Sequence, residues 1–430
     1  MKKLNLVVIG GASTYTPELI DQIINNQNEL NLAKITLLDI ALNKEKLSII
    51  EGLSKRMLSK AKLDIEIIAT TNRRDALKNA DFIILQLRVG KQNLRFFDET
   101  IPYQYGLLGH ETIGIGGLFS ALRTVPVIYE IIEDIKEICP NAWTLCVSNP
   151  IGIISEAVFR FSEYERFIGI CTDPLTMHEE LAEAMNVKRN EIIPYIGGVN
   201  ELSFATKVYK NHKDKLPELL KNSNLHECVN LSKNELTVLE CYPNPAVGFN
   251  IHHEEILETR AKKPARAKVV AQIENELFEI YKDEHLDTKP KELEKRIGTN
   301  YAKEVIDIMI SMVQNKKNYF VVNTINRGHI TDIREECAIE ITSRLTSKGP
   351  LPVHIGELPQ SVKGLVQHQK AYEELLCDAI YEKNLTKALM ALKLHPLTRS
   401  SKQATNAFNE LLKVNKPYLT YYGDFNDEIN

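Results

Sequence analysis

The chain has 430 residues, which exceeds one ordinary domain and favours two lobes that share an interface. Its composition, 43% apolar and 26% charged residues, is that of a water-soluble globular protein. A formal net charge of -4 argues against nucleic acid or an anionic membrane as the main partner, and we expect neither. No apolar run reaches the length that spans a bilayer.

The cysteines and the first residues indicate a cytoplasmic protein. Seven cysteines are scattered along the chain without a Cys-x-x-Cys pair, which suits reduced thiols better than a disulfide framework. The first ten residues carry too short an apolar stretch for a signal peptide, and they lack a cleavage site.

The first forty residues predict a strand, a tight turn, a helix and a second strand. Residues 4–9 are apolar, Thr16 and Pro17 mark a helix start with Thr16 as the cap, and residues 35–39 end in an acid. This order fits a dinucleotide site, in which glycines admit a pyrophosphate, a helix N-terminus faces it and an acid accepts from ribose hydroxyls. Ala12 and Tyr15 replace the usual second and third glycines, so the turn taken alone is a weak motif. The candidate cofactor residues are Gly10, Gly11, Ala12, Ser13, Thr14 and Asp39.

Apolar segments continue to alternate with helices up to about residue 171. They lie at residues 65–69, 82–87, 143–147 and 167–170. Such alternation predicts an α/β fold with a Rossmann-like, doubly wound parallel sheet. Beyond it the pattern changes to helices mixed with short strands, including an amphipathic helix at 266–282, a strand at 319–323 and helices over 360–413. We therefore expect a Rossmann-like domain at 1–171 and an α+β lobe at 172–430 that covers the far end of the cofactor.

Arginines, acids and glycines concentrate directly after the apolar run at 82–87. Loops beyond the carboxyl ends of parallel strands form the ligand crevice, so residues 88–126 predict a site for a polar, anionic small molecule. Arg95 is the candidate clamp, because a guanidinium can meet a phosphate or carboxylate with two hydrogen bonds. The alternatives are a long solvated loop and a surface ion pair of Arg95 with Asp98 or Glu99.

Three further candidates follow strand ends or a glycine turn. Asn149 comes after the strand at 143–147 and can bond substrate hydroxyls, although Asn-Pro is also a common turn. Cys171 ends the next strand and as a thiolate could ligate a soft or borderline divalent metal, but a lone cysteine is more often a small buried hydrophobe. Glu201 offers a carboxylate after a glycine turn. Cys171 and Glu201 make an incomplete metal set unless substrate or water supplies further ligands.

The chain resembles glycoside hydrolase family 4, the NAD- and metal-dependent glycosidases. The resemblance covers nearly the whole sequence, and within the family the chain is most similar to the 6-phospho-β-glucosidases. The motifs that carry it are residues 9–19, 88–126, 148–156, 169–171, 199–200, 266–281, 322–326 and 395–397. The opening domain is also that of the lactate and malate dehydrogenases, so the resemblance implies a fold of their kind.

The resemblance implies hydrolysis of a 6-phospho-β-glucoside-like substrate by NAD-dependent redox elimination. NAD takes a hydride from carbon 3 of the sugar, and a divalent metal, usually manganese, polarises the oxygens on carbons 2 and 3. A base removes the proton on carbon 2, the aglycone leaves, and water adds before the hydride returns. By position, Arg95, Asn149 and Arg266 bind a sugar phosphate or acidic glycoside, and Cys171 is a metal ligand. A homo-oligomer, a dimer or tetramer, is implied as well.

Three positions depart from the family pattern. The family has Asn or Asp after the metal-ligating cysteine, near the leaving group, where this chain has Thr172 followed by Asp173. The second metal ligand of the family is a histidine, and Glu201 stands there. Ala246 replaces the proton-abstracting tyrosine, and Tyr242 or Asp173 is a candidate to substitute for it. The expected catalytic residues are Thr172, Asp173 and Tyr242, and the expected metal ligands are Cys171 and Glu201.

Two other functions stay open. The departures also fit a catalytically silent sensor or partner subunit that binds NAD or sugar phosphate. A plain dehydrogenase of the lactate/malate type would share the opening domain. Against it, the sequence has no histidine placed as a general base of that kind, and residues 109–117 are foreign to those enzymes.

Overall fold

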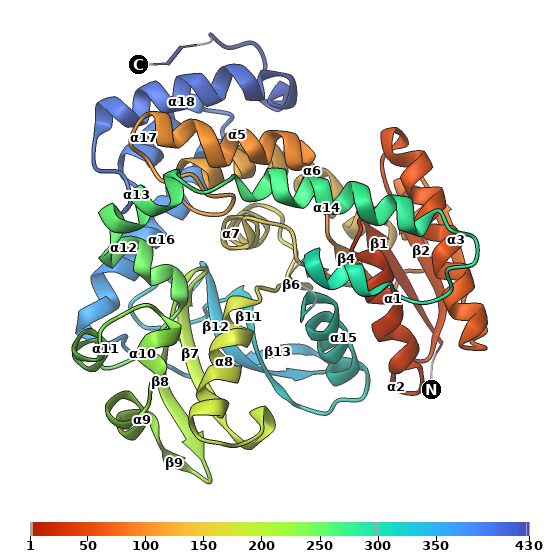
Figure 1. Cartoon of the computed structure of the whole chain (residues 1–430), viewed down its shortest axis with the longest axis horizontal. Coiled ribbons are helices and arrows are strands. Elements are labelled where there is room, and N and C mark those ends of the chain that lie inside the picture. The colour runs from red at the N-terminus through yellow and green to blue at the C-terminus, as the bar shows by residue number, and fades with distance from the viewer. Residues whose placement is uncertain (1–2, 297–299, 427, 430) are drawn as a thin grey trace.

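The parallel half of the sheet has the predicted architecture. The computed structural model describes residues 3–296, 300–426 and 428–429. Its first six strands run parallel in the order β3-β2-β1-β4-β5-β6 (Figure 1). They are β1 (Leu4–Ile9), β2 (Leu32–Leu38), β3 (Glu66–Thr70), β4 (Phe82–Leu85), β5 (Trp143–Cys146) and β6 (Phe167–Gly169). This is the strand order of a dinucleotide-binding fold, so the Rossmann-like prediction is confirmed.

The sheet does not stop at the predicted domain boundary. From β6 it continues with antiparallel pairings in the order β11-β12-β7-β8-β10. These strands are β7 (Ile193–Val199), β8 (Leu202–Lys210), β10 (Tyr242–Pro243), β11 (Tyr319–Ile325) and β12 (Ala338–Thr346). Two shorter ones, β9 (Lys213–Asp214) and β13 (Gly349–Pro352), pair with β8 and β12. One sheet thus joins residues 1–171 to 172–430, and their folding as separate domains stays a prediction.

Helices cover both faces of the sheet and bury two apolar cores. One face carries α6 (Gly114–Ile138), α7 (Ile151–Phe161), α16 (Gln360–Tyr381), α17 (Leu385–Lys393) and α18 (Ser401–Asn415). The other carries α1 (Thr16–Asn25), α3 (Lys44–Lys60) and α15 (Asn300–Val313). In Figure 1 the C-terminal helices lie beside α5 (Lys91–Gln104) and α6, so the end of the chain returns to the first lobe.

Further helices connect these layers. The predicted amphipathic helix is α14 (Arg266–Tyr281), which packs on α5 at one end and on α3 at the other (Figure 1). The shorter ones are α2 (Gln27–Leu30), α4 (Arg73–Leu77), α8 (Asp173–Ala184), α9 (Leu216–Asn222), α10 (Leu225–Cys228), α11 (Lys233–Leu239), α12 (Gly248–Ile251) and α13 (His253–Ala261).

The segment at 88–126 is mostly helical, so its interpretation as a long solvated loop is wrong. Helices α5 and α6 occupy most of it, and only residues 105–113 connect them. Arg95, Asp98 and Glu99 all lie on the buried side of α5, because residues three and four positions apart share one face of a helix.

Helix α6 is long and apolar enough to cross a membrane by length and composition alone. However, 83% of its most apolar 18-residue window is buried inside the protein. Its apolar side chains pack in the same core as α7 and α18. Helix α6 is therefore a core helix.

Candidate active site

The turn after β1 packs too closely on its neighbours to carry side chains. Gly10 has a φ of +89°, and a Cβ there would lie 2.8 Å from the carbonyl oxygen of Gln86, just beyond β4. A Cβ on Gly11 would lie 2.9 Å from the Cβ of Leu37 on β2. The two glycines therefore allow the close approach that a dinucleotide turn needs. Helix α1 begins at Thr16 itself, so Thr16 is not the cap as predicted.

Asp39 and Thr14 are placed to meet a bound dinucleotide. The Asp39 carboxylate accepts hydrogen bonds from the backbone N–H groups of Ala12 (2.9 Å) and Ile40 (2.8 Å). These bonds hold the acid beside the turn and leave lone pairs for ribose hydroxyls. The Thr14 hydroxyl is buried and has no hydrogen-bond partner within the described residues. Because an unpaired buried hydroxyl is costly, it suits an acceptor such as a pyrophosphate, and these residues fit NAD.

A segment from the second half of the chain closes over the same turn. The Tyr281 hydroxyl, at the end of α14, donates to the Thr14 carbonyl oxygen (2.9 Å). Arg296 donates to the Tyr15 hydroxyl (3.2 Å), and its guanidinium lies 4.5 Å from the centre of the Tyr15 ring. Arg296 also pairs with Glu274 of α14 (2.7 Å). These contacts lie at the turn, so the expected covering of the far end of the cofactor stays a prediction, and no sequence pattern marks Arg296.

Glycines fix the connecting stretch at 105–113 against α5 and α6. A Cβ on Gly109 would lie 2.0 Å from the carbonyl oxygen of Glu99, and one on Gly116 would lie 2.0 Å from that of His110. A side chain at either position would force the stretch away from the helices. The glycines of this segment therefore serve close packing, which holds Glu111 in place.

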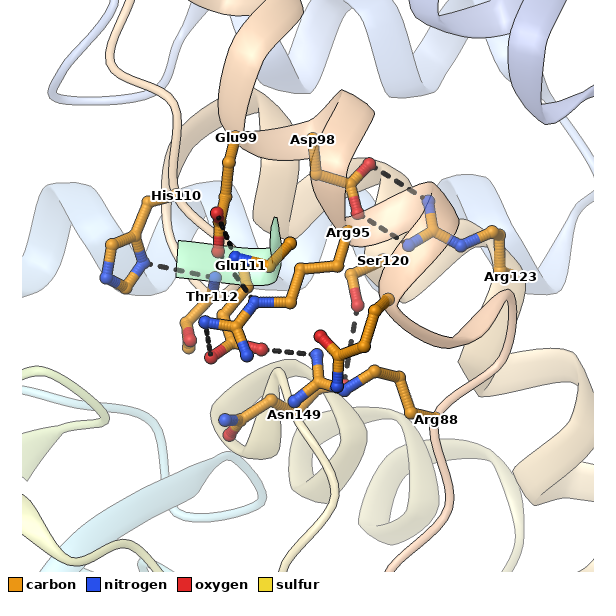
Figure 2. Close-up of polar contacts among 12 residues, drawn as sticks. Arg88, Arg95, Asp98, Glu99, His110, Glu111, Thr112, Ser120, Arg123 and Asn149 are labelled. Carbon is orange, nitrogen blue, oxygen red and sulfur yellow. Dashed lines mark hydrogen bonds and ion pairs between the residues drawn. The ribbon is translucent and has the colours of Figure 1, made fainter. Parts of the chain in front are cut away.

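Two arginines share one carboxylate next to β4 (Figure 2). The Oε1 atom of Glu111 lies 3.0 Å from Nη2 of Arg95, and its other oxygen pairs with Arg88. Arg95 also pairs with Glu99, one turn along α5 (2.6 Å). Burial acts to raise the pKa of Glu111, but Arg88 and then Arg95 outweigh it and lower that pKa to about 2. Glu111 therefore stays charged and holds the two guanidinium groups together.

Arg95 is not in a surface ion pair. Its side chain is 9% exposed and pairs with Glu99, whereas Asp98 pairs with Arg123 (2.6 Å). The predicted alternative, a surface ion pair with Asp98 or Glu99, is right about Glu99 as a partner, but this pair is buried. Burial of an arginine beside the dinucleotide turn suits a binding site, and its role as the anion clamp stays a prediction.

The two other predicted substrate residues flank these groups. Asn149 follows β5, and its backbone oxygen accepts from the Ser120 hydroxyl (3.5 Å), as Figure 2 shows. Its side-chain amide has no protein partner in the described part of the chain, which leaves it for a ligand. Arg266 begins α14, and its guanidinium donates to the Arg296 carbonyl oxygen at 3.4 Å.

Glu201 lies in the two-residue turn between β7 and β8. Its φ of +62° is unusual for a residue with a side chain and costs about 1–2 kcal/mol, and such strain concentrates at functional sites. Glu201 is 7% exposed, and its Oε2 atom has no hydrogen-bond partner within the described residues. Burial and then the charge of Asp173 raise its pKa, while the side chain of Thr112 lowers it. Thr112 thus links Glu201 to the stretch that carries Glu111.

Cys171, Asp173 and Glu201 form one buried electronegative cluster. Burial raises the pKa of the Cys171 thiol, and the charges of Asp173, Glu340 and Glu201 raise it further. Burial also raises the pKa of Asp173. Each group thus disfavours negative charge on the others, and a divalent cation among them would relieve the repulsion.

Sequence reasoning missed two members of this neighbourhood, Tyr301 and Glu340. Tyr301 lies in the first turn of α15; burial and then the nearby Cys171 and Asp173 raise its pKa, and the Thr172 side chain lowers it. Nothing in the sequence marks Tyr301. Glu340, however, is an acid between two isoleucines in the strand 338–346, and an acid flanked in this way is a signal of an unusual buried group.

The structure does not bring Tyr242 into the cluster. Its side chain is fully buried in a separate apolar core, where its hydroxyl donates to Glu180 of α8 (2.5 Å). Burial and the Glu180 carboxylate raise the pKa of Tyr242. Ala246 lies in another apolar cluster, beside Leu108 and Phe249. Of the two candidates for the missing base, only Asp173 lies with Cys171.

The cluster fits a divalent metal as an incomplete ligand set. Cys171 offers sulfur and Glu201 an unpaired oxygen, donors that borderline divalent ions accept. Among the described residues, three potential ligand atoms within 4.8 Å of one another occur at Glu156, Cys337 and Glu374, whose carboxylates already pair with cationic side chains. The Cys171 cluster forms no such trio, so substrate or water would complete the coordination.

Comparison with known proteins identifies the family. The family model for family 4 glycosyl hydrolase matches residues 5–187, and that for the family 4 glycosyl hydrolase C-terminal domain matches residues 196–398. A probable 6-phospho-β-glucosidase of Bacillus subtilis is 37% identical over 98% of both chains. A 6-phospho-β-glucosidase of Escherichia coli is 35% identical, again over 98% of both.

Solved structures agree with this result. The 6-phospho-β-glucosidase of Thermotoga maritima, in a structure with manganese, NAD+ and glucose 6-phosphate, matches with a TM-score of 0.89 at 28% identity, over 96% of this chain and 99% of that one. A malate dehydrogenase of Plasmodium falciparum matches with a TM-score of 0.50 at 18% identity, over 91% of this chain and 100% of that one, which confirms the dehydrogenase-like fold. With family models over both halves and relatives of this identity, the chain belongs to family 4 of the glycosyl hydrolases.

Proposed function

We propose that this chain hydrolyses 6-phospho-β-glucosides with the help of NAD and a divalent metal, manganese first. The observation that carries the proposal is the position of the Arg88–Glu111–Arg95 group. It lies next to β4, and the dinucleotide turn follows β1, its neighbour in the sheet. An anion at the arginines and a dinucleotide at the turn would therefore meet at one edge of the sheet. The related Thermotoga maritima structure holds glucose 6-phosphate together with NAD+.

The sugar phosphate would bind at the arginines. A phosphate carries negative charge, whereas a sugar without phosphate carries none. Two guanidinium groups held at one carboxylate therefore favour the phosphorylated glycoside. Asn149 would offer its side-chain amide to sugar hydroxyls, and Arg266 stands at the start of α14 as a further cation. Specificity for the 6-phosphate over glucose is the direct consequence.

NAD would bind at residues 10–14 and Asp39. When bound, it supplies a hydride acceptor for carbon 3 of the sugar and returns the hydride at the end. Gly10 and Gly11 let the pyrophosphate approach the backbone, and the unpaired Thr14 hydroxyl donates to it. Asp39, fixed by two backbone N–H groups, accepts from the adenosine ribose.

The metal would bind at Cys171 and Glu201, where it polarises the sugar oxygens. A carboxylate in place of an imidazole makes the ligand set harder and more negative, which suits manganese or magnesium and disfavours softer ions. Because these two residues cannot close the coordination sphere, the sugar hydroxyls complete it. Binding of metal and binding of sugar then support each other.

Asp173 is the residue that we assign to proton transfer. Burial raises its pKa, so the carboxylate is a stronger base that would take the proton from carbon 2, and the carboxyl would deliver a proton to the leaving group. Thr172, beside it at the start of α8, interacts with the Tyr301 phenol and lowers its pKa. Tyr242 has no part in this assignment, because its hydroxyl is engaged by Glu180.

A release assay separates this function from a catalytically silent homologue. The substrates are chromogenic β-glucosides with and without the 6-phosphate and the corresponding 6-phospho-α-glucoside. We expect release only from the phosphorylated β-anomer, and only with both NAD and manganese. Release from none of them, with NAD and glucose 6-phosphate still binding, would establish the silent alternative.

A homo-oligomer and a cytoplasmic location complete the proposal. The family resemblance supports a dimer or tetramer, and phosphorylated sugars are substrates of the cell interior. Light scattering on the purified protein measures the oligomeric state, and fractionation of the source cells measures the location. A monomer at micromolar concentration would contradict the proposed assembly.

A further inference from the structure

Glu340 is a fully buried acid near the start of β12. The side chain is 0% exposed and has no ion-pair partner within the described residues. A buried carboxylate without a counter-charge is costly, and such groups are kept where they are paired, coordinated or used.

Three uncharged side chains from different segments donate to this carboxylate. Its Oε1 atom accepts from the amides of Asn200 (3.1 Å) and Asn323 (3.2 Å). Its Oε2 atom accepts from the hydroxyl of Ser203 (2.7 Å). Asn200 precedes Glu201 in the turn between β7 and β8, Ser203 is on β8 and Asn323 is on β11. Glu340 thus ties the turn to the centre of the sheet.

The order of strands in the sheet explains why these hydrogen bonds between the turn and the sheet matter. Cys171 follows β6, Glu201 lies beyond β7, and β11 and β12 separate these two strands. Three inter-strand steps correspond to about 14 Å, so the two side chains reach a common cation only if the turn is held over the sheet. Asn323 pairs with Gly169 of β6, and a Cβ added to Gly169 would lie 2.9 Å from the Cβ of Asn323. One carboxylate therefore contacts both the segment beside Cys171 and the turn that carries Glu201.

We propose that Glu340 is a positioning residue for the cation site, which sets the separation of Cys171 and Glu201 through its bonds to Asn200, Ser203 and Asn323. The inference rests on the proposed function, because it presumes that Cys171 and Glu201 hold a divalent cation. Glu340 acts here through three hydrogen bonds to its two oxygens, and we assign the ligand role to Cys171 and Glu201 alone. Its effect passes through the geometry of the turn.

The test compares manganese affinity by calorimetry among full-length variants with NAD present. Glu340→Gln keeps the shape: its amide oxygen can accept from both asparagines and its NH2 can donate to Ser203. Glu340→Met has the same reach but no acceptor. Glu156→Gln is the matched control, since Glu156 is also a 0% exposed acid but is bonded to Lys370 (2.9 Å). NADH affinity reports whether each variant is folded.

We expect Glu340→Met to weaken manganese binding by about 10- to 100-fold, the usual range for partners that orient metal ligands. Glu340→Gln should stay within about threefold of the wild type, because the three hydrogen bonds survive. Glu156→Gln should bind as the wild type does. NADH affinity should be the same in all four proteins. If Glu340→Met does not fold, Ser203→Ala removes a single bond and should cost about 2- to 10-fold in manganese affinity.

Two results would overturn the proposal. The first is a folded Glu340→Met protein that binds manganese as tightly as the wild type, which would show that the Glu340 hydrogen bonds do not act on the cation site. If the Met variant does not fold, wild-type manganese affinity in Ser203→Ala has the same meaning. A loss in Glu340→Gln as large as in Glu340→Met would show that charge, not position, matters. Absence of manganese binding by the wild type itself is a different result, which rejects the metal site of the proposed function.

Discussion

The Nη2 atom of Arg95 lies 3.0 Å from the Oε1 atom of Glu111, whose other oxygen pairs with Arg88. A substrate anion would therefore join an existing ion group and would not have to gather free arginines. Glu111 fixes the positions of both guanidinium groups before the substrate arrives. Preorganised charge of this kind favours binding, because little side-chain entropy is lost on association.

Replacement of Arg95 by lysine should weaken the binding of glucose 6-phosphate by about 1–3 kcal/mol. A point charge replaces a planar fork, so one charge-assisted hydrogen bond to the phosphate is lost. Calorimetry on wild type and Arg95→Lys measures the change. Arg74→Lys, at an arginine on the protein surface, is the control and should bind as the wild type does. Equal binding of glucose and glucose 6-phosphate by the wild type would rule out the clamp.

Glu111 should make the stability of the protein depend on acid pH. Its pKa in the fold is about 2, below the ordinary 4.5, so its stabilisation is complete above pH 4.5 and is lost as the pH falls towards 2. The shift corresponds to about 3 kcal/mol of unfolding free energy at neutral pH. Urea unfolding of wild type and Glu111→Gln should show a gap of this order at pH 7 that narrows below pH 4.5.

The matched control for that series is Glu133→Gln, at an exposed acid that pairs with Lys136. Its unfolding free energy should follow the wild type at each pH. A gap between wild type and Glu111→Gln that stays constant from pH 7 to pH 3 would contradict the assignment of the shift to Arg88 and Arg95.

Thr14→Val should weaken NADH binding without loss of stability. The valine keeps the shape of the side chain and removes a buried hydroxyl that has no partner among the described residues, so the unliganded fold loses nothing. The hydrogen bond to the pyrophosphate is charge-assisted, and its loss should cost about tenfold in affinity. NADH fluorescence titration measures this, with Thr405→Val on α18 as the control. Unchanged NADH affinity in Thr14→Val would place the pyrophosphate elsewhere.

Glu201→His should change which metal the site prefers. An imidazole is a softer ligand than a carboxylate, so zinc should gain on manganese relative to the wild type. Calorimetric titrations with both ions at pH 7.5 decide. An identical preference order in the two proteins would mean that residue 201 does not touch the metal.

The first half of the fold could be predicted because its central strands are mostly buried on both faces. Mainly apolar runs such as residues 4–9 and 82–87 predict such strands, and the alternation with helices predicts their parallel order. The extension by β7, β8 and β12 could not be predicted, since mixed polar strands pair according to tertiary context. The helix at 91–104 could not be predicted either, because its many charged and polar residues are typical of a loop, although several of them are buried in ion pairs.

Some positions of the candidate site could be expected from the sequence, and others could not. Arg95, Asn149 and Cys171 follow strand ends, and the doubly wound topology brings strand ends together whatever the details of packing. Tyr242 could not be placed, because a short edge strand turns its ring into a separate core, toward Glu180. The role of Glu340 depends on register between strands far apart in the sequence, which no local pattern records.

The most direct test of the central claim is hydrolysis of a chromogenic 6-phospho-β-glucoside in D2O, with NAD and manganese. If the reaction proceeds by removal of the proton on carbon 2, the glucose 6-phosphate produced carries deuterium at that carbon, which NMR detects. Cys171→Ser protein purified in parallel, with glucose 6-phosphate added, reports any exchange by contaminating isomerase. Proton removal at carbon 2 predicts deuterium at that carbon in step with release of the aglycone, and aglycone release with hydrogen retained at carbon 2 would contradict the proposed mechanism.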